Sequence, residues 1–206
     1  MHPESRAGLL NIRHIAVTEG VNGPGARLTV WAQGCPFVCE GCFNPELRPF
    51  ENKRLLSPEK LLEEALSLDF SGVTLSGGEP FAQADELADF LRLLKAKRPK
   101  TGVIAFTGYT LAELKNGPWE LKKLLCEIDL LIDGRYEVQS PSAGSLRGSS
   151  NQRLVPLTET GLDLLEEIVM NSRAETALTI TGEGEVIVSG FPTAEFVRNL
   201  RNKLSG

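Results

Sequence analysis

Three of the four cysteines of the chain lie close together, in the order Cys35-x3-Cys39-x2-Cys42. Thiolates at such spacing can wrap one cuboidal iron–sulfur cluster, and three ligands leave the fourth iron open to a small molecule. A structural zinc site and three unrelated core cysteines are the alternatives. Zinc usually takes four protein ligands, and no fourth ligand is obvious here: His14 or Cys126 could supply it only if the fold brought one of them to the loop. The spacing therefore favours a [4Fe–4S] cluster.

A second unusual loop follows the short apolar segment 72–76 and begins with the pair Gly77-Gly78. Glycines have no Cβ, so their backbone N–H groups can approach a ligand closely, and the next residue, Glu79, can accept a hydrogen bond from an ammonium group. Alone, such a turn is more often an ordinary loop. Its position after a strand, in a chain that carries the cysteine loop, favours a binding site.

Short apolar segments alternate with amphipathic helical patterns along most of the chain. We expect strands at 27–33, 72–76, 102–107 and 128–133, and helices from 57, over 83–97, and over 110–126 with a break at 116–118. This alternation is typical of α/β proteins with a mainly parallel sheet, whose chemistry lies at the carboxyl ends of the strands. The cysteine loop, Gly77, Thr107 and Asp133 all follow a strand end.

The pattern changes near Thr158. We expect a helix whose apolar face holds Leu162, Leu165, Ile168 and Val169, then two strands at 177–181 and 185–189 around a hairpin turn at 182–184, and a last helix after 191–193 with an apolar face of Phe196, Val197 and Leu200. This segment has no cysteine or histidine. We therefore expect a core over 1–157 and an α+β extension over 158–206, packed on the same domain and serving architecture or partner docking rather than chemistry.

Composition sets further limits. A chain of 206 residues is enough for one domain with a sizeable core, and a net charge of −5 argues against a general nucleic-acid binder. The sequence has no apolar run long enough to cross a membrane and no pattern of a signal peptide, so a cytoplasmic protein is expected. Cys126 lies on a leucine-rich helix and is expected to be an inert buried thiol, and His14 to be structural.

The cysteine motif resembles that of the radical S-adenosylmethionine superfamily, and the run 76–80 (SGGEP) resembles its motif for the methionine amino group. The run 21–27 (VNGPGAR) is similar to activases of glycyl radical enzymes. Three further motifs, at 107–109 (TGY), 133–136 (DGRY) and 147–152 (RGSSNQ), resemble the activating proteins of anaerobic (class III) ribonucleotide reductase. The ordered resemblance extends from about residue 11 to 156.

This resemblance implies a partial (β/α) barrel with an α+β extension. It implies cluster ligands at Cys35, Cys39 and Cys42. The residues implied to bind S-adenosylmethionine are Gly41, Cys42, Phe43, Gly77, Gly78, Glu79, Pro80, Thr107 and Asp133. Those implied to contact the substrate or partner are Asn22, Gly23, Pro24, Gly25, Arg147, Ser149, Ser150, Asn151 and Gln152. No acid–base dyad is required.

The implied activity is that of a radical activase. It cleaves S-adenosylmethionine reductively and removes a hydrogen atom from a glycine of anaerobic ribonucleotide reductase, with flavodoxin or ferredoxin as electron donor and without nucleic acid or membrane. Because the chain continues to residue 206, well beyond the motif at 147–152, a radical enzyme acting on another protein or on a small molecule, such as a deazapurine synthase, remains an alternative. A non-catalytic iron–sulfur electron carrier is another.

Overall fold

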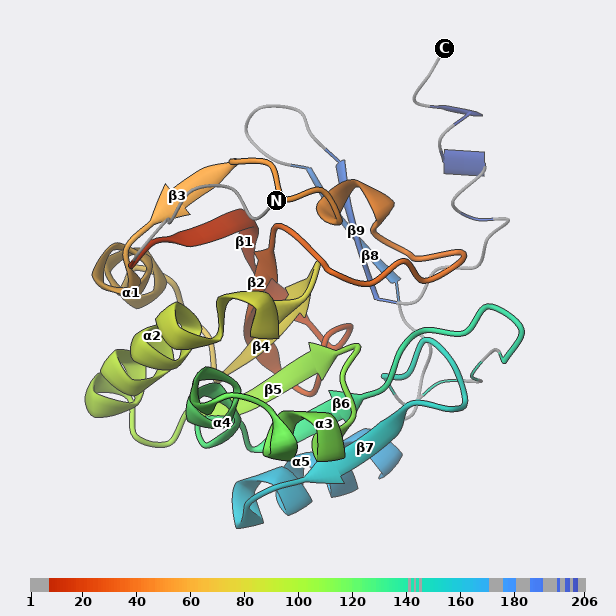
Figure 1. Cartoon of the computed structure of the whole chain (residues 1–206). Coiled ribbons are helices and arrows are strands. Elements are labelled where there is room, and N and C mark those ends of the chain that lie inside the picture. The colour runs from red at the N-terminus through yellow and green to blue at the C-terminus, as the bar shows by residue number, and fades with distance from the viewer. Residues whose placement is uncertain are drawn as a thin grey trace.

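The computed structural model describes residues 8–140, 142, 144, 146–170, 176–180, 186–190, 196, 199–200 and 202–203. Its main element is a seven-stranded sheet in the order β3-β1-β2-β4-β5-β6-β7 (Figure 1). The strands are β1 (Leu10–Glu19), β2 (Ala26–Ala32), β3 (Arg54–Leu56), β4 (Gly72–Gly77), β5 (Gly102–Thr107), β6 (Leu130–Asp133) and β7 (Arg153–Pro156). The four strands β2, β4, β5 and β6 are parallel to one another, whereas β1, β3 and β7 pair antiparallel.

Helices connect the parallel strands in the expected positions. They are α1 (Pro58–Leu66), α2 (Ala84–Lys97), α3 (Leu111–Asn116) and α4 (Trp119–Leu125). Ser57 caps α1 by accepting a hydrogen bond from the backbone of Lys60, and Thr110 and Glu113 form a capping box at α3. The break between α3 and α4 falls at Gly117 and Pro118, as predicted.

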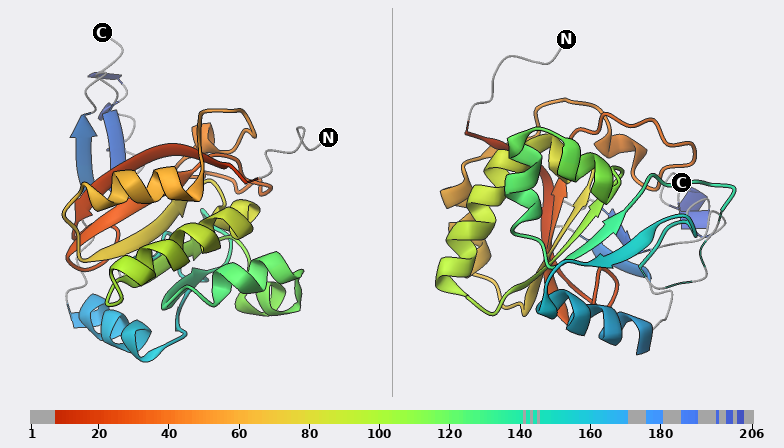
Figure 2. Two further views of the ribbon diagram at one scale, coloured as in Figure 1. Left: turned by 90° about the vertical axis from the view of Figure 1, so that its left-hand side faces the viewer. Right: turned by 60° about the horizontal axis from the view of Figure 1, so that its bottom comes forward.

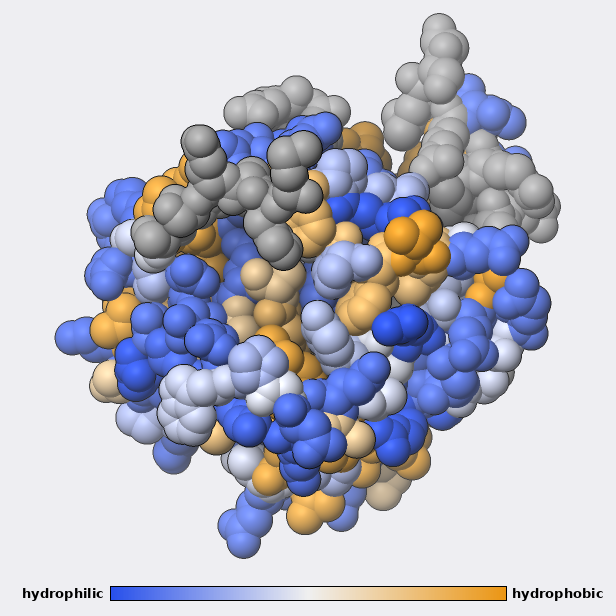
Figure 3. All heavy atoms as spheres, in the orientation of Figure 1, coloured by the Kyte–Doolittle hydropathy of each residue, from blue (hydrophilic) through white to orange (hydrophobic). Residues whose placement is uncertain are grey.

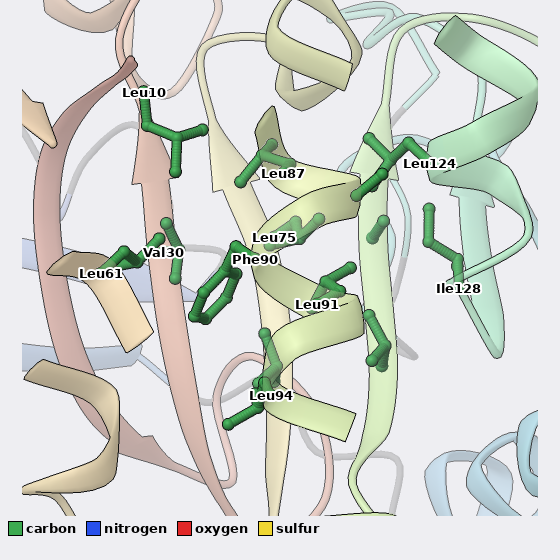
Figure 4. Packing of buried hydrophobic residues seen from close by; sticks show 14 of the residues in the cluster. Leu10, Val30, Leu61, Leu75, Leu87, Phe90, Leu91, Leu94, Leu124 and Ile128 are labelled. Atoms are coloured by element: carbon green, nitrogen blue, oxygen red, sulfur yellow. The ribbon is translucent and has the colours of Figure 1, made fainter. Parts of the chain in front are cut away.

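One face of the sheet forms the main core with these helices (Figure 4). Leu87, Phe90, Leu91 and Leu94 share one side of α2, where they are fully buried against strand residues such as Leu75. Burying a side chain of this size contributes about 1.5–3 kcal/mol. On the surface drawn in Figure 3, hydrophilic residues dominate and hydrophobic ones are scattered.

The opposite face is covered in part by α5 (Glu159–Met170), which lies apart from the layer of α1, α2 and α4 (Figure 2). Leu164, Leu165 and Ile168 pack against side chains of β5 and β6. The helix comes so close to the sheet that a Cβ at Gly161 would lie 1.9 Å from the backbone oxygen of Asp129. The expected helix is confirmed, and its predicted apolar face is confirmed in part: Leu165 and Ile168 pack against the sheet, whereas Leu162 and Val169 are 52% and 60% exposed.

The predicted fold class, a partial barrel with parallel central strands, is confirmed, since β3 and β7 end the sheet without pairing to each other. The antiparallel strands β1, β3 and β7 were not predicted. A separate hairpin of β8 (Thr176–Ile180) and β9 (Val186–Gly190) matches the two predicted strands. Its turn at 182–184, the run 191–193 and Val197 lie outside the described residues.

Two further observations concern the expectations from composition. Cys126 is exposed, so the expected buried thiol is wrong. The reason is that α4 ends at Leu125, and it is Leu124 that its last turn buries. Within the described part of the chain, no helix is both long and apolar enough to span a membrane.

Candidate active-site cavity

A cavity of about 400 Å³ opens at the carboxyl ends of the parallel strands. The loops after β2, β4, β5 and β6 all contribute to its wall, so the structure brings the four predicted loops together. Its lining residues are Arg13, His14, Asn22, Trp31, Cys35, Phe37, Cys39, Cys42, Phe43, Asn44, Glu46, Leu47, Ser76, Gly77, Gly78, Glu79, Phe106, Thr107, Gly108, Gly134, Tyr136, Gly148, Gln152, Val186, Val188, Gly190 and Leu200.

The cysteine loop follows β2 and is closed by backbone hydrogen bonds. The N–H groups of Gly34 and Cys35 donate to the carbonyl oxygens of Leu47 and Arg48, at 2.8 and 2.9 Å. Gln33 closes the same loop by donating to the carbonyl oxygen of Pro49 at 2.7 Å. Polar backbone groups that are satisfied in this way fix the loop without help from a ligand.

All three cysteines of the motif are partly buried and line the cavity. Burial, together with negative charge on Glu79, Cys42 and Cys39, raises the pKa of Cys35 to about 11. Burial also raises the pKa of Cys42. The thiols are therefore close enough to disfavour one another as thiolates, and a cationic iron centre would relieve this repulsion.

Among the described residues, no group of three or more histidine, cysteine or acidic side chains converges closely enough to hold a single metal ion. In a cuboidal cluster each thiolate binds a different iron, so the three sulfur atoms share a cavity without meeting at one point. The side chains of Cys35, Cys39 and Cys42 fit this arrangement.

The glycine pair after β4 supports the cysteine loop directly. Gly78 donates to the carbonyl oxygen of Ala32 at 2.8 Å, and Glu79 donates its backbone N–H to that of Gly34 at 2.9 Å. A Cβ at Gly78 would lie 2.4 Å from the Gly34 oxygen and 2.8 Å from that of Leu47. The missing Cβ at Gly78 thus lets the backbone of the cysteine loop pack closely against it, and Gly78 also lines the cavity, where its contact with a ligand stays a prediction.

The side chain of Glu79 is almost fully buried, and protein groups already hold it. Its Oε1 accepts from the backbone of Phe81 and from the hydroxyl of Thr107, both at 2.9 Å, and its Oε2 accepts from the backbone of Gly108 at 2.8 Å. Burial raises the pKa of Glu79 to about 7. Since a carboxylate has about four acceptor positions, one remains for a further donor. Pro80 begins a short 3-10 helix (Pro80–Gln83) and lies outside the lining.

Asp133 does not line the cavity, and its contact with a cofactor stays a prediction. Its carboxylate pairs with the guanidinium of Arg153 on β7 and accepts from the backbone of Leu111 at 2.7 Å. The side chain therefore joins β6 to β7 and to the start of α3. Gly134, the next residue, takes the place in the cavity wall that was expected for Asp133.

An aromatic pair forms another part of the wall. Phe43, in the cysteine loop, packs against Tyr136 with ring centroids 4.9 Å apart, and both line the cavity together with Cys42. Gly41 lies outside the lining at a positive φ of 69°, and a Cβ there would lie 3.0 Å from Val138. The sequence motif contained Tyr136, but its role in the wall was not predicted.

Of the four residues expected from the loop before β2, only Asn22 reaches the cavity. Its amide donates to the hydroxyls of Thr18 and Thr29 at 3.2 and 3.3 Å. Gly23, Pro24 and Gly25 precede the amino end of β2 and do not line the cavity, so their contact with the partner stays a prediction. At Gly25 a Cβ would lie 2.9 Å from the hydroxyl of Ser71, just before β4.

The motif at 147–152 mainly stabilises its own loop through hydrogen bonds of Gln152. Gln152 accepts from the backbone N–H groups of Gly148 and Ser149 at 2.8 and 3.2 Å, and donates to the carbonyl oxygen of Gly134 at 2.9 Å. Gln152 also lines the cavity. The other residues predicted to contact the partner do not line it: they are Arg147, Ser149, Ser150 and Asn151.

Comparison with known proteins agrees with this geometry. Residues 21–155 match the family model described as a 4Fe-4S single cluster domain. The anaerobic ribonucleoside-triphosphate reductase-activating protein of Enterobacteria phage T4 is 33% identical over 150 residues, which are 70% of this chain and 93% of that protein. The protein of the same name from Pasteurella multocida is 35% identical over 152 residues, covering 69% and 94%. The chain belongs to this family of activating proteins. The Escherichia coli member is 33% identical over 144 residues, covering 64% and 89%.

Among solved structures, the crystal structure of QueE from Escherichia coli aligns with 64% of this chain and 72% of its own, at a TM-score of 0.41 and 16% identity. This distant likeness supports no conclusion about fold or function. The activating-protein family is established by the sequence relatives alone, whose length is almost fully covered.

Sequence reasoning missed part of the cavity wall that β1 supplies. The pairing of β1 with β2 is irregular between Ile12 and His14, and this β-bulge lets the adjacent residues Arg13 and His14 both line the cavity. Neighbours in a regular strand point to opposite faces. The ring of His14 also meets that of Trp31 edge-on, with centroids 6.5 Å apart.

Proposed function

We propose that this chain holds a [4Fe–4S] cluster on Cys35, Cys39 and Cys42 and uses it to activate an anaerobic ribonucleoside-triphosphate reductase. The observation that supports this most strongly is the convergence of these cysteines with the loops after β4 and β5 on one cavity, in a chain of the activating-protein family. These three cysteines would hold the cluster, which when reduced would supply one electron for the reductive cleavage of S-adenosylmethionine that generates the glycyl radical of the reductase.

Different residues of the cavity wall bind different parts of S-adenosylmethionine. We assign the methionine ammonium to the remaining acceptor position of Glu79, which Thr107 and the backbone of Gly108 hold in place. The aromatic pair of Phe43 and Tyr136 offers a flat apolar surface for the adenine ring. No side chain is needed as a general acid or base, because the reaction moves a hydrogen atom rather than a proton.

The setting of the reaction follows from the same chemistry. A thiol-ligated cluster with one open iron requires a reducing compartment, so we place the activity in the cytoplasm. We propose flavodoxin or ferredoxin as the electron donor. Four cysteines without a disulfide among them are compatible with this setting.

The test uses anaerobically reconstituted protein, dithionite, S-adenosylmethionine and the anaerobic ribonucleoside-triphosphate reductase of the same organism. We expect methionine and 5′-deoxyadenosine in equal amounts, and a glycyl radical on the reductase by electron paramagnetic resonance. A protein that binds the cluster without cleaving S-adenosylmethionine would be an electron carrier. Cleavage without any radical on the reductase would indicate an enzyme for another protein or a small molecule.

A further inference from the structure

The hairpin β8–β9 forms a side of the cavity that the family match does not include. The match to the 4Fe-4S domain ends at residue 155, whereas Val186, Val188 and Gly190 of β9 line the cavity together with the cysteines. Part of the extension, which was expected to serve architecture or partner docking, therefore lies in the wall of the site. Anything that reaches the cysteines meets a wall that β9 contributes.

The register of the hairpin extends this wall outward. Ile180 pairs with Val186 and Leu178 pairs with Val188, and residues paired directly across antiparallel strands project from the same face. The two valines reach into the cavity, while Leu178 and Ile180 are 49% and 72% exposed. These four residues, which we call the hairpin strip, form an apolar path from the surface to the interior of the cavity.

We propose that the hairpin strip docks an extended, uncharged segment of the glycyl radical partner, the segment that carries the target glycine into the cavity. The proposal rests on the proposed function, because a glycine that loses a hydrogen from its Cα must enter with the chain on either side of it. An extended segment places alternate side chains on one face, a spacing that Val186 and Val188 on β9 also have.

The chemistry of the strip distinguishes this occupant from a small molecule. None of its four side chains carries a charge or a hydrogen-bonding group, so the strip cannot orient the ammonium or carboxylate of S-adenosylmethionine. It also continues beyond the cavity, where only a longer chain would cover it. A third exposed apolar residue lies in the cysteine loop: Val38 is 80% exposed and stands between Phe37 and Cys39, which line the cavity. Exposed apolar surface beside a binding cavity is typical of a protein-interaction site.

The test replaces Leu178 and Ile180 together by threonine, which keeps β-propensity and removes apolar contact. Because the two side chains are 49% and 72% exposed, the loss of burial inside the protein is small. The matched control is Val169→Thr with Met170→Gln, two residues of α5 that are 60% and 85% exposed. Each cluster-loaded protein is assayed for its Kd for the anaerobic ribonucleoside-triphosphate reductase, for S-adenosylmethionine cleavage without the reductase, and for its oligomeric state.

We expect the Kd of the hairpin variant for the reductase to rise about tenfold or more, with proportionally slower glycyl radical formation and unchanged cleavage without the reductase. The control should match the wild type in every assay. A hairpin variant that binds the reductase as tightly as the wild type overturns the proposal, and a change only in self-association would assign the strip to a second copy of the chain. If the wild-type protein forms no glycyl radical at all, the proposed function fails, and the docking proposal fails with it.

Discussion

The two ends of the parallel strands use their polar groups in different ways. At the amino ends, Arg27 is almost fully buried and donates to the hydroxyl of Thr74 at 2.7 Å and to the carbonyl oxygen of Gly102 at 2.8 Å. Burial lowers the pKa of Arg27 to about 10, and the charges of Asp129 and Glu167 offset part of this effect. At the carboxyl ends, the cysteines are only partly buried and line an open cavity.

This difference separates stability from activity within one sheet. Polar groups at the amino ends satisfy one another, so removing one leaves the others unpaired and costs folding free energy. At the carboxyl ends the unfavourable features are tolerated: two thiols and one carboxyl group have raised pKa values because of burial. Perturbed groups of this kind gather where a ligand is to be bound. Substitutions at the two ends should therefore affect different measurements.

The largest effect is expected from the cysteines. Cys35→Ala should reduce bound iron from about four per chain to almost none, since two thiolates cannot retain a cluster in an open cavity. Cys126→Ala is the matched control, because Cys126 is exposed at the end of α4 and does not line the cavity. Iron and sulfide analysis after anaerobic reconstitution measures both. If the Cys35 variant retained four irons, the cluster would not bind at the carboxyl ends of the strands.

The next effect concerns the amino ends. Arg27→Met should lower the free energy of unfolding by about 3 kcal/mol, because the acceptors around Arg27 lose a buried charged donor. Urea unfolding of the metal-free protein measures this change. Arg92→Met is the control: Arg92 is largely exposed and pairs with Asp89, so we expect a change of less than about 0.5 kcal/mol. If both variants lost equal stability, Arg27 would not hold the amino ends together.

The sequence predicted the parallel strands well because their signals are local. Continuous apolar runs, the Ser57 cap and the Thr110 capping box each act within a few residues, and the structure has all of them. It did not predict β1, whose sequence LNIRHIAVTE mixes polar and apolar residues, because that strand is defined by pairing with β2 and β3.

Within the site, residue type was predicted better than residue contact. The cysteines and Glu79 reach the cavity, whereas Asp133 binds Arg153, a partner twenty positions later in the chain. Nothing in a local motif reports such a long-range pair. The same limit applies to the hairpin: its two strands were predicted, but their place in the cavity wall depends on tertiary packing alone.

The smallest expected effect is a dependence of S-adenosylmethionine binding on pH, through the carboxyl group of Glu79. A carboxyl group whose pKa is raised to about 7 by burial is protonated below pH 7, so it loses the negative charge that attracts an ammonium group and accepts from it more weakly. Binding of S-adenosylmethionine to the cluster-loaded protein should therefore weaken about tenfold between pH 8 and pH 6. In the metal-free protein the same raised pKa means that the folded state retains a proton that the unfolded state loses. Folding stability should accordingly fall as the pH rises from about 4.5 to about 7.

The variant Glu79→Gln isolates this carboxyl group. It should bind S-adenosylmethionine weakly at every pH and lose the dependence on pH, because an amide does not titrate and presents an N–H group where Gly108 or Phe81 donates. Glu113→Gln is the matched control, since Glu113 is exposed in the capping box of α3 and its pKa is lowered, away from this range. Binding titrations at pH 6, 7 and 8 on the three proteins decide the matter. An equal affinity of the wild type at pH 6 and pH 8 would show that the buried carboxyl group only braces the loops after β4 and β5.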